Sequence, residues 1–483
     1  MWMEEFFKSV TFEDFLIRPH HGMLDSRKDA NLTMQFSRRI SIKTPIVGAN
    51  MDTVTGENMM KALSLNGCFG FIHRNCSIEK EARQVAAVKR QQSFIVANPL
   101  AVGKNMPIKE AKRIVKIEKV SGLLVEESPG SGILAGILSR RDFPRDNDEK
   151  LVSEFMTPFD RLVTAKEGVS LEEAERVMYE IRKEKLPIID ENGKIRGLVT
   201  MKDLEKSKHF PYSSIDSRGR LLVGATIGAT GDFMERAAAI IEAEADCVLI
   251  DIAHGDSEVM RKAVESFKAK FPNTELVCGN VGTRDGARFL ADLGADAVKV
   301  GIGPGHGCRT RIETGVGVPQ MQAIREAYLG VDGRVPIIAD GGIEDDGEIA
   351  KAIFCGADTV MLGSMIAGTD ESPGVISINP ATKKQVKKYR GMTSPDAVLD
   401  RNDWENPSEI LESSPAQEGQ PLEIDYVGSV VPIIKRIREH LQSTVSYTGQ
   451  RTLSLVHKLA VASPYDYFIN KLTEAAQKES FDR

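Results

Sequence analysis

The stretch Gly294-Ala-Asp-Ala-Val298 has two near-copies elsewhere in the chain, Glu244-Ala-Asp-Cys-Val248 and Gly356-Ala-Asp-Thr-Val360. Each copy joins the end of a segment with helical periodicity to a short, mostly apolar run. Parallel strands that are buried on both faces show this apolar pattern, and helices connect them. The repeat therefore predicts an α/β protein built from successive strand–helix units.

Eight apolar runs are candidate strands of one parallel sheet. Polar residues and glycines follow nearly all of them, which favours a closed (β/α)8 or TIM barrel with its site at the C-terminal ends of the strands. A doubly wound open sheet is the alternative, although it would place such loops at a single switch point. The runs are residues 45–49, 68–73, 221–225, 247–252, 275–279, 297–300, 336–339 and 359–362.

Residues 93–217 interrupt this repeat and contain an internal duplication. Gly136-Ile-Leu-Ser-Arg-Arg-Asp142 matches Gly197-Leu-Val-Thr-Met-Lys-Asp203, and an apolar run with a glycine-bearing turn precedes each copy. Two copies of one unit predict a small pseudo-symmetric domain, inserted between barrel parts 1–92 and 218–483.

Both copies carry a hydroxyl three residues before an aspartate. Ser139 precedes Asp142 in the first copy, and Thr200 precedes Asp203 in the second. This spacing fits helix capping, and it also fits a hydroxyl and a carboxylate that hold a ribose. Both interpretations stay open from the sequence.

A glycine-rich loop, residues 301–320, follows the candidate strand 297–300 and carries Cys308 at its centre. Glycine tolerates positive φ and close approach to a ligand, so the loop is expected to fold tightly or to move. The charges of Arg309 and Arg311 favour the thiolate, the nucleophilic form of cysteine. A small buried thiol without chemistry is the alternative, and the glycine-rich, cationic setting favours the nucleophile.

A second long segment, residues 393–428, lacks clear periodicity and contains Pro395, Pro407, Pro415 and Pro421. Long segments without regular structure are usually functional or disordered. We expect it to form a flap over the site.

The amino-acid composition limits the classes of protein to which the chain can belong. The chain has 483 residues, 41% hydrophobic and 27% charged, with a formal net charge of −6, which argues against nucleic-acid binding. We see neither a signal peptide nor an apolar run of membrane-spanning length, so no membrane partner is expected. The six cysteines are widely spaced without a CxxC pair, which indicates reduced thiols, no zinc site and a cytoplasmic protein.

Seven motifs together resemble the IMP dehydrogenase/GMP reductase family, in the right order over almost the whole chain. The resemblance implies a TIM barrel, a purine mononucleotide substrate, a nicotinamide cofactor, and a homotetramer that can pair into an octamer. The duplicated insert resembles the tandem CBS (Bateman) module of that family, which binds ATP or GTP and regulates activity; Ser139, Asp142, Thr200 and Asp203 are then its nucleotide contacts. The motifs are Asn50-Met-Asp-Thr-Val-Thr55, Asp251-Ile-Ala-His-Gly255, Gly279-Asn-Val-Gly-Thr283, the Cys308 loop, Asp340-Gly-Gly-Ile343, Gly363-Ser364 and Tyr389-Arg-Gly-Met392.

The resemblance also implies roles for single residues. Cys308 would attack purine C2, with Thr310 and Glu418 assisting. The family usually has a serine two residues before the nucleophile, where this chain has His306, which can still donate to a phosphate. The implied substrate residues are Met51, His306, Asp340, Gly342, Gly363, Ser364, Tyr389, Gly391 and Met392; the cofactor residues are Asp251, Asn280 and Gly301; and the carbonyls of Gly303, Gly305 and Cys308 would hold potassium in a dehydrogenase.

The choice between the two family reactions rests on the flap and the C-terminus. No Arg-Tyr pair, which serves the dehydrogenases in water activation, occurs in residues 393–428. Glu418-Gly419, Gly391-Met-Thr-Ser394 and Leu441-Gln-Ser-Thr-Val-Ser-Tyr-Thr-Gly449 resemble the reductases. We therefore predict an NADPH-dependent GMP reductase that forms IMP and ammonia. The alternatives are an IMP dehydrogenase that uses NAD to form XMP, favoured by the insert and by Asp251-Ile-Ala-His-Gly255, and a purine-nucleotide sensor without turnover.

Overall fold

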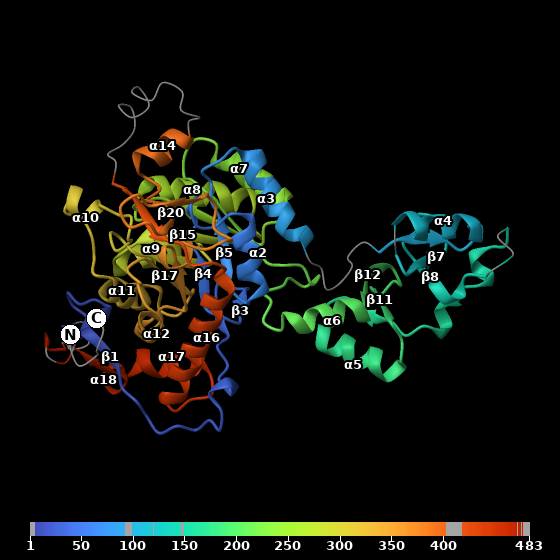
Figure 1. Ribbon diagram of the computed structural model, residues 1–483, viewed down its shortest axis with the longest axis horizontal. Coiled ribbons are helices and arrows are strands. Elements are labelled where there is room, and N and C mark those ends of the chain that lie inside the picture. Colours follow the sequence, from blue (N-terminus) through green and yellow to red (C-terminus); the bar gives the residue numbers. More distant parts are fainter. Residues whose placement is uncertain are drawn as a thin grey trace. The chain divides into compact units, whose positions relative to one another are not determined.

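The computed structural model describes most of the chain, in two compact units. Unit 1 comprises Met1–Lys89, Tyr212–Ser214 and Leu221–Arg483, and unit 2 comprises Arg90–Pro211 and Ile215–Arg220 (Figure 1). The predicted start of the insert at Ser93 and the middle of the predicted flap lie outside the described residues. These are 5–91, 99–118, 120–144, 146, 149–401, 418–470, 472–474 and 476.

Unit 1 contains a closed barrel of eight parallel strands. Each predicted apolar run overlaps one of them, so the barrel prediction is confirmed and the open sheet is wrong. The strand that was predicted to begin at residue 221 begins at Gly224. Residues 221–223 are buried but are not part of the strand. In barrel order the strands are β13 (Gly224–Ile227), β14 (Cys247–Asp251), β15 (Glu275–Val281), β16 (Ala297–Val300), β17 (Ile337–Asp340), β18 (Thr359–Leu362), β4 (Ile46–Gly48) and β5 (Phe69–Ile72).

The aspartates of the three repeated joints fix the strand register at the N-terminal end of the barrel. Asp296 donates its backbone N–H to the Leu276 carbonyl at 2.7 Å, and its carboxylate accepts the Leu276 N–H at 2.9 Å. This reciprocal pair satisfies two backbone groups that would otherwise be unpaired where the strand begins. The same pair joins Asp246 with Val223 and Asp358 with Ile337.

Helices surround the barrel strands in unit 1 (Figure 1). Several begin at a side chain that accepts a backbone N–H of the first turn, as Ser257, Thr283 and Asp345 do. The helices are α2 (Glu57–Leu65), α3 (Ile78–Gln91), α7 (Phe233–Glu242), α8 (Glu258–Lys270), α9 (Arg284–Asp292), α10 (Thr310–Glu313), α11 (Gln320–Val331), α12 (Asp346–Cys355), α13 (Ser364–Ala367), α14 (Pro395–Arg401), α16 (Val430–Tyr447), α17 (Leu453–Ala462) and α18 (Pro464–Tyr467).

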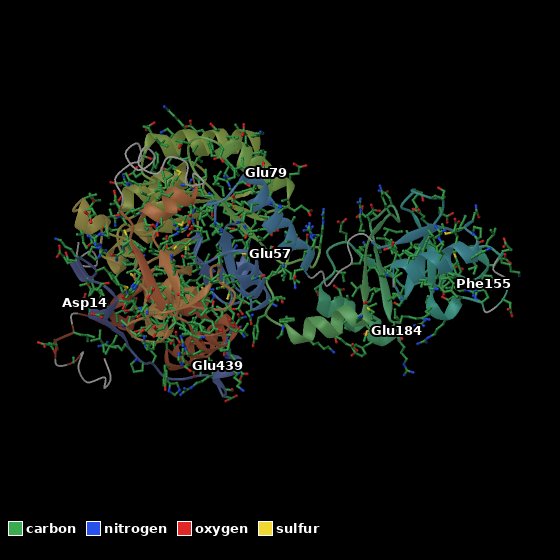
Figure 2. All side chains as sticks on the ribbon, turned by 45° about the horizontal axis from the view of Figure 1, so that its top comes forward. Asp14, Glu57, Glu79, Phe155, Glu184 and Glu439 are labelled. Carbon is green, nitrogen blue, oxygen red and sulfur yellow. The ribbon has the colours of Figure 1, made fainter. Side chains whose placement is uncertain are left out.

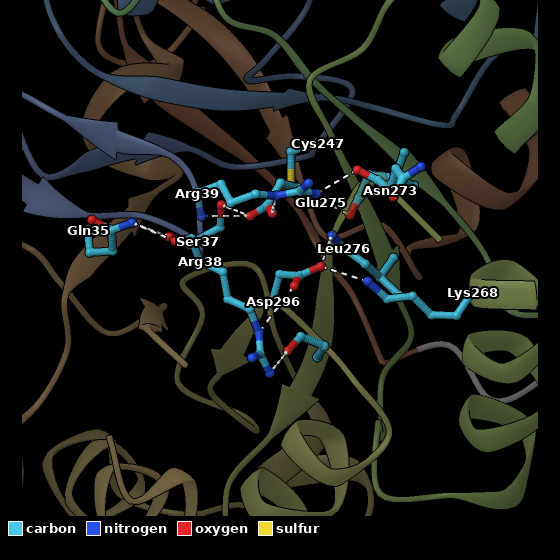
Figure 3. Close-up of polar contacts among 12 residues, drawn as sticks. Gln35, Ser37, Arg38, Arg39, Cys247, Lys268, Asn273, Glu275, Leu276 and Asp296 are labelled. Atoms are coloured by element: carbon cyan, nitrogen blue, oxygen red, sulfur yellow. Dashed lines mark hydrogen bonds and ion pairs between the residues drawn. The ribbon is translucent and has the colours of Figure 1, made fainter. Parts of the chain in front are cut away.

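A polar network lies at the N-terminal end of the barrel, opposite the face that carries the site (Figure 3). Glu275, at the start of β15, has a side chain only 5% exposed and accepts hydrogen bonds from Ser37 and from the Arg39 side chain. Lys268 and Arg38 pair with Asp296 at 2.7 and 3.2 Å. These cations stabilise two carboxylates that would be costly to bury alone. Residues 34–42 include the short strands β2 (Met34–Gln35) and β3 (Ser41–Ile42).

Two further sheets belong to unit 1. β1 (Phe15–Ile17) pairs with β22 (Phe468–Asn470), which joins the N-terminal and C-terminal segments. A three-stranded antiparallel sheet has the order β19 (Ile376–Ile378), β20 (Gln385–Arg390) and β21 (Pro421–Asp425). This second sheet positions Tyr389 and the residues around Glu418.

Unit 2 has two halves of the same topology. In each half a first strand pairs parallel with a second, which pairs antiparallel with a third. Gly136 and Gly197, from the duplicated motif, occupy the third strand of their halves. The elements are β6 (Ala101–Gly103), α4 (Ile108–Glu118), β7 (Gly122–Glu126), β8 (Leu134–Ser139) and β9 (Thr157–Pro158) in one half, and β10 (Ala165–Lys166), α5 (Leu171–Ile181), β11 (Lys185–Ile189), β12 (Ile195–Thr200) and α6 (Met201–His209) in the other.

The short 3-10 helices complete the described elements: Phe12–Asp14, Arg27–Asp29, Arg140–Asp142, Val152–Glu154 and Phe159–Arg161. Across the described part of the chain, every helix is too short or too polar to cross a bilayer.

Candidate active site at the C-terminal face of the barrel

The glycine-rich loop after β16 is held by the segment that returns from the predicted flap. Cys308 forms an antiparallel bridge with Gly419. Arg309 donates its backbone N–H to the Glu418 carbonyl at 2.7 Å, and Gln420 donates its own to the Gly307 carbonyl at 3.1 Å. Two segments more than a hundred residues apart therefore meet at the cysteine.

Three side chains from these segments form a hydrogen-bonded chain. The Cys308 thiol lies 3.1 Å from Thr310 Oγ1, and Thr310 Oγ1 donates to Glu418 Oε2 at 2.6 Å. Cys308 is half-buried, whereas Cys68, Cys247, Cys278 and Cys355 are buried. The thiol is thus accessible at the barrel rim, next to a carboxyl group that can exchange a proton through a hydroxyl.

The positive field expected from the neighbouring arginines is partly compensated. Arg309 forms an ion pair with Glu313 at 2.7 Å, and the guanidinium of Arg311 donates to the Val318 carbonyl at 2.6 Å. Arg311 also packs against Gly303, where φ is +88° and a Cβ would clash with its side chain. Both arginines therefore stabilise the loop, a role that their sequence position alone did not reveal.

A buried charge cluster lies under the site, at the ends of three barrel strands. Lys299 contacts Asp251 at 2.9 Å and Asp340 at 2.7 Å, and its own side chain is 3% exposed. Asn280 donates to Asp340 at 2.9 Å, and Asn50 donates to Asp251 at 2.9 Å. The structure thus brings together Asp251, Asn280 and Asp340, which the sequence motifs had only placed in separate loops.

Two residues of this charge cluster, Lys299 and Asn50, were not predicted as site residues from the sequence. Lys299 is a charged residue within an otherwise apolar strand, 297–300, and that exception was the available signal. Asn50 stands beside Met51 in a motif that was already singled out. Gln320 is a third, since its amide donates to the carbonyls of Val300 at 2.9 Å and Asp340 at 3.1 Å.

Tyr389, at the end of β20, lies against the loop after β4. Its hydroxyl is 3.6 Å from the sulfur of Met51, and a Cβ on Gly363 would lie 2.9 Å from the same hydroxyl. Burial raises the pKa of the Tyr389 phenol above its ordinary value, with smaller contributions from the charges of Asp340 and Cys308. The phenol therefore stays neutral and can donate a hydrogen bond.

The fold and this geometry agree with what is known of one family. The model of the IMP dehydrogenase / GMP reductase domain matches residues 9–482. The chain belongs to the IMP dehydrogenase/GMP reductase family. It is 41% identical over 453 residues to the inosine-5'-monophosphate dehydrogenase of Nitrosopumilus maritimus, covering 93% of this chain and 94% of that protein. The corresponding enzyme of Aquifex aeolicus is 40% identical over 457 residues, covering 94% and 92% of the two chains.

Solved structures similar to this family member carry the other family name. A cysteine-to-alanine variant of GMP reductase from Trypanosoma brucei, in complex with guanosine 5'-monophosphate, matches with a TM-score of 0.74 and 35% identity over 99% of this chain and 98% of that one. The same reductase in complex with guanosine 5'-triphosphate matches with a TM-score of 0.64 and 33% identity, over 96% and 98%. The protein is therefore a purine nucleotide oxidoreductase with a nicotinamide nucleotide cofactor.

The remaining substrate residues expected from the family lie around the same loop. Gly342, with φ at +74°, packs against Pro304, and Ser364 begins the short helix α13 that follows β18. Met392 is half-buried after Tyr389, and His306 is exposed, with its ring 6.2 Å from the Tyr389 ring. His306 can therefore meet a ligand from solvent, although it makes no hydrogen bond to another described residue.

Three glycines permit close backbone approaches at the site of this family member. A Cβ on Gly391 would lie 2.6 Å from the Gly307 carbonyl oxygen, and a Cβ on Gly419 would lie 2.6 Å from the Ser394 nitrogen. Gly301, the third expected cofactor residue, has φ at +153°, and a Cβ there would lie 2.0 Å from the Asp340 carbonyl oxygen. Larger residues at positions 391 and 419 would separate the segments that bring Cys308 and Glu418 together.

The family resemblance implies two bound groups, a nicotinamide cofactor and a potassium ion, and the residues present offer acceptor atoms to both. The carboxylate of Asp251 is 24% exposed and is held by Lys299 and Asn50, so it can accept hydrogen bonds from a ribose or carboxamide of the cofactor. The Gly305 carbonyl accepts the Cys308 N–H at 2.9 Å but has a second lone pair for a cation such as potassium. Among the described residues, His, Cys, Asp and Glu side chains form no group that could hold a metal ion.

The residues of unit 2 that were expected to contact a regulatory nucleotide lie in different surroundings. The Asp142 carboxylate accepts both the N–H and the hydroxyl of Ser139 at 2.7 Å. These two bonds agree with the interpretation of this spacing as a helix cap. Thr200 lines a cavity of ≈ 460 Å³ together with Glu184, which is labelled in Figure 2. The side chain of Asp203 lies outside the described residues.

Proposed function

We propose that this protein is a GMP reductase that uses NADPH to convert GMP into IMP and ammonia. The observation that carries this proposal is the hydrogen-bonded chain from Cys308 through Thr310 to Glu418, with distances of 3.1 and 2.6 Å. Loss of the purine 2-amino group as ammonia requires a proton donor beside C2, and the carboxyl group of Glu418, bonded to Thr310 beside the cysteine, is suited to that task. The absence of an Arg-Tyr pair from residues 393–428 supports the same choice, because the hydrolytic reaction needs a base for water.

The reaction balances with these residues. The Cys308 sulfur bonds to purine C2, and Glu418 delivers a proton through Thr310 so that the amino nitrogen leaves as ammonia. A nicotinamide cofactor, when bound, would supply the hydride to C2, and the Cys308 sulfur would then leave C2 as the thiolate. The sum is GMP + NADPH + 2 H⁺ → IMP + NADP⁺ + NH₄⁺. Forming a covalent intermediate divides one difficult displacement into two easier steps.

The other residues bind the two nucleotides in this proposal. Asp340, whose side chain is 23% exposed, would accept the ribose hydroxyls of the mononucleotide, and Met51 and Tyr389 would line the base. The glycines at 342 and 363 and the neighbouring Ser364 would meet the phosphate, as the last strands of a barrel often do. His306, which is exposed, would add a further hydrogen-bond donor to the phosphate.

IMP dehydrogenase is the second candidate. The relatives from Nitrosopumilus maritimus and Aquifex aeolicus, at 41% and 40% identity, carry that name. In this reaction the same Cys308 adduct would be hydrolysed to XMP after hydride transfer to NAD⁺, and the carbonyls of Gly303, Gly305 and Cys308 would hold potassium. A binding protein without turnover is the third candidate.

One assay separates the candidates. With GMP and NADPH we expect the absorbance of the reduced nicotinamide to fall while IMP and ammonia form in equal amounts. Formation of XMP from IMP and NAD⁺, with no reaction of GMP, would replace our proposal by the dehydrogenase. Tight binding of both nucleotides without turnover in either mixture would favour the sensor.

We also propose that unit 2 is the tandem CBS module of this protein and binds ATP or GTP. The two halves of like topology and the ≈ 460 Å³ cavity beside Thr200 support this assignment. The structural neighbour from Trypanosoma brucei in complex with guanosine 5'-triphosphate supports a guanine nucleotide. By the same family resemblance we propose a cytoplasmic homotetramer that can form an octamer.

A further inference from the structure

Lys299 joins the two carboxylates to which the proposed function assigns the two ribose groups. Its ammonium group contacts Asp251 at the end of β14 and Asp340 at the end of β17, at 2.9 and 2.7 Å. It also donates to the side-chain oxygen of Asn280 in β15. One cation within β16 therefore ties together the ends of three other barrel strands.

The balance of charges explains why the ammonium group stays there. Burial disfavours the charged form of Lys299, but Asp251 and Asp340 outweigh burial and raise its pKa above the ordinary value. Burial likewise opposes ionisation of Asp251, but Lys299 and the hydrogen bond from Asn50 outweigh it and lower the pKa of that carboxyl. One cation thus keeps the Asp251 carboxylate ionised in a place where a lone carboxylate would be costly, and it also pairs with Asp340 at 2.7 Å.

The exposure of the three groups separates their roles. The Lys299 side chain is 3% exposed, while those of Asp251 and Asp340 are 24% and 23% exposed. The carboxylates can therefore meet ligands, whereas the ammonium group is occupied by polar contacts to the two carboxylates and to Asn280. Lys299 contacts both carboxylates, so a change at one of them can affect the other through it.

We propose that Lys299 is a positioning residue that couples the mononucleotide site to the cofactor site through Asp340 and Asp251. Because it acts on both carboxylates, its loss weakens both ligands, and a change at one carboxylate alters the ligand of the other. The inference rests on the proposed assignment of these two carboxylates, and it holds for either reaction of the family, since both reactions use both ligands.

The chain offers a matched control. The side chain of Lys89 is also 3% exposed and pairs with Asp246 at 2.7 Å, at the N-terminal end of the barrel. The first test compares Lys299→Met with Lys89→Met in the full-length protein, with folding followed by circular dichroism. Binding of GMP alone and of NADPH alone is measured by calorimetry, so no turnover occurs.

We expect Lys299→Met to weaken both GMP and NADPH about tenfold or more, and Lys89→Met to leave both within about twofold. A folded Lys299→Met protein that loses affinity for only one ligand, or for neither, overturns the inference. Equal losses in the two variants also overturn it, because they would indicate a general effect on the fold.

A second variant keeps the test open if Lys299→Met does not fold. In Asp251→Asn the ammonium group of Lys299 keeps Asp340 as its charged partner, and Asn still offers an oxygen acceptor, so the fold is expected to tolerate the change. The ammonium group then neutralises Asp340 alone, which makes Asp340 a weaker acceptor, and we expect GMP binding in the absence of cofactor to weaken about threefold. Unchanged GMP affinity overturns the coupling.

Failure of the underlying assignment looks different. If Asp251→Asn leaves NADPH affinity unchanged and Asp340→Asn leaves GMP affinity unchanged, these carboxylates are not the ribose-binding groups. If both variants weaken their own ligand while Lys299→Met weakens neither, the assignment holds and the coupling fails.

Discussion

Thr310 donates a 2.6 Å hydrogen bond to Glu418, although 108 residues separate them in the chain. The bond exists because the Cys308 loop and the return segment of the flap pair through their backbones, with Cys308 opposite Gly419. A nucleophile and a proton donor are thereby placed on two sides of one hydroxyl. The following predictions test this arrangement and the barrel that supports it.

Replacing Glu418 by Gln should lower the rate of ammonia release about 10²- to 10⁴-fold, because the proton donor is lost while the hydrogen bond to Thr310 remains possible. Single-turnover kinetics with GMP and NADPH measures this step directly. Glu313→Gln is the control, since Glu313 pairs with Arg309 in the same region but is not in the hydrogen-bonded chain. Equal rates for the two variants would remove Glu418 from the mechanism.

Replacing Cys308 by Ala should abolish turnover and leave nucleotide binding within about threefold, because the adduct forms only during reaction. Mass spectrometry with an electrophilic purine analogue should find one modified cysteine in the native protein. Cys76→Ala is the control, since Cys76 is also half-buried and its pKa is raised to about 11, chiefly by burial. Modification at Cys76 instead of Cys308 would contradict the assignment.

Replacing Gly391 by Ala should reduce turnover about tenfold or more. The new Cβ would lie 2.6 Å from the Gly307 carbonyl oxygen and would push the loop from the flap, at a cost of about 1–3 kcal/mol. Gly22→Ala is the control, because its nearest contact would be at 3.7 Å. Steady-state kinetics and the melting temperature of both variants test this expectation. A fully active Gly391→Ala protein would show that the close approach of residues 391 and 307 is not needed.

Asp246 and Asp358, two of the aspartates in the repeated joints, should respond differently to replacement by Asn. Asp246→Asn loses the charge that pairs with Lys89 at 2.7 Å, and we expect a loss of about 2 kcal/mol in the free energy of unfolding. In Asp358, burial raises the pKa of the carboxyl, while His457 and the Ile337 N–H only partly oppose it. Asp358→Asn keeps an acceptor for that N–H and removes a disfavoured charge, so at neutral pH its melting temperature should stay level or rise by about 2 °C.

The sign of the pH dependence follows from the raised pKa of Asp358. In the folded protein the carboxyl holds its proton to higher pH than in the unfolded chain, so its contribution to stability is present at low pH and is lost as pH rises through the folded-state pKa. The advantage of Asp358→Asn should therefore grow from acidic to neutral pH. Thermal denaturation of both proteins across this range measures it, and an advantage that shrinks towards neutral pH would contradict the raised pKa.

The sequence by itself determined the barrel, the place of its site and the family. Continuous apolar runs such as Thr359–Leu362 favour strands buried on both faces, and the repeated joints at Asp246, Asp296 and Asp358 mark where strands begin. The motif glycines and Cys308 indicated the chemistry, because their residue types have few other uses at strand ends.

Only the tertiary structure decided which side chains meet. Partners far apart in sequence, such as Thr310 and Glu418, have no periodicity that links them, since the contact depends on how two loops fold over the barrel. The same holds for Lys299, whose charge looked out of place in an apolar strand until Asp251 and Asp340 were found beside it. Burial and ionic pairing are properties of the assembled barrel, because they depend on distances in space that no local pattern encodes.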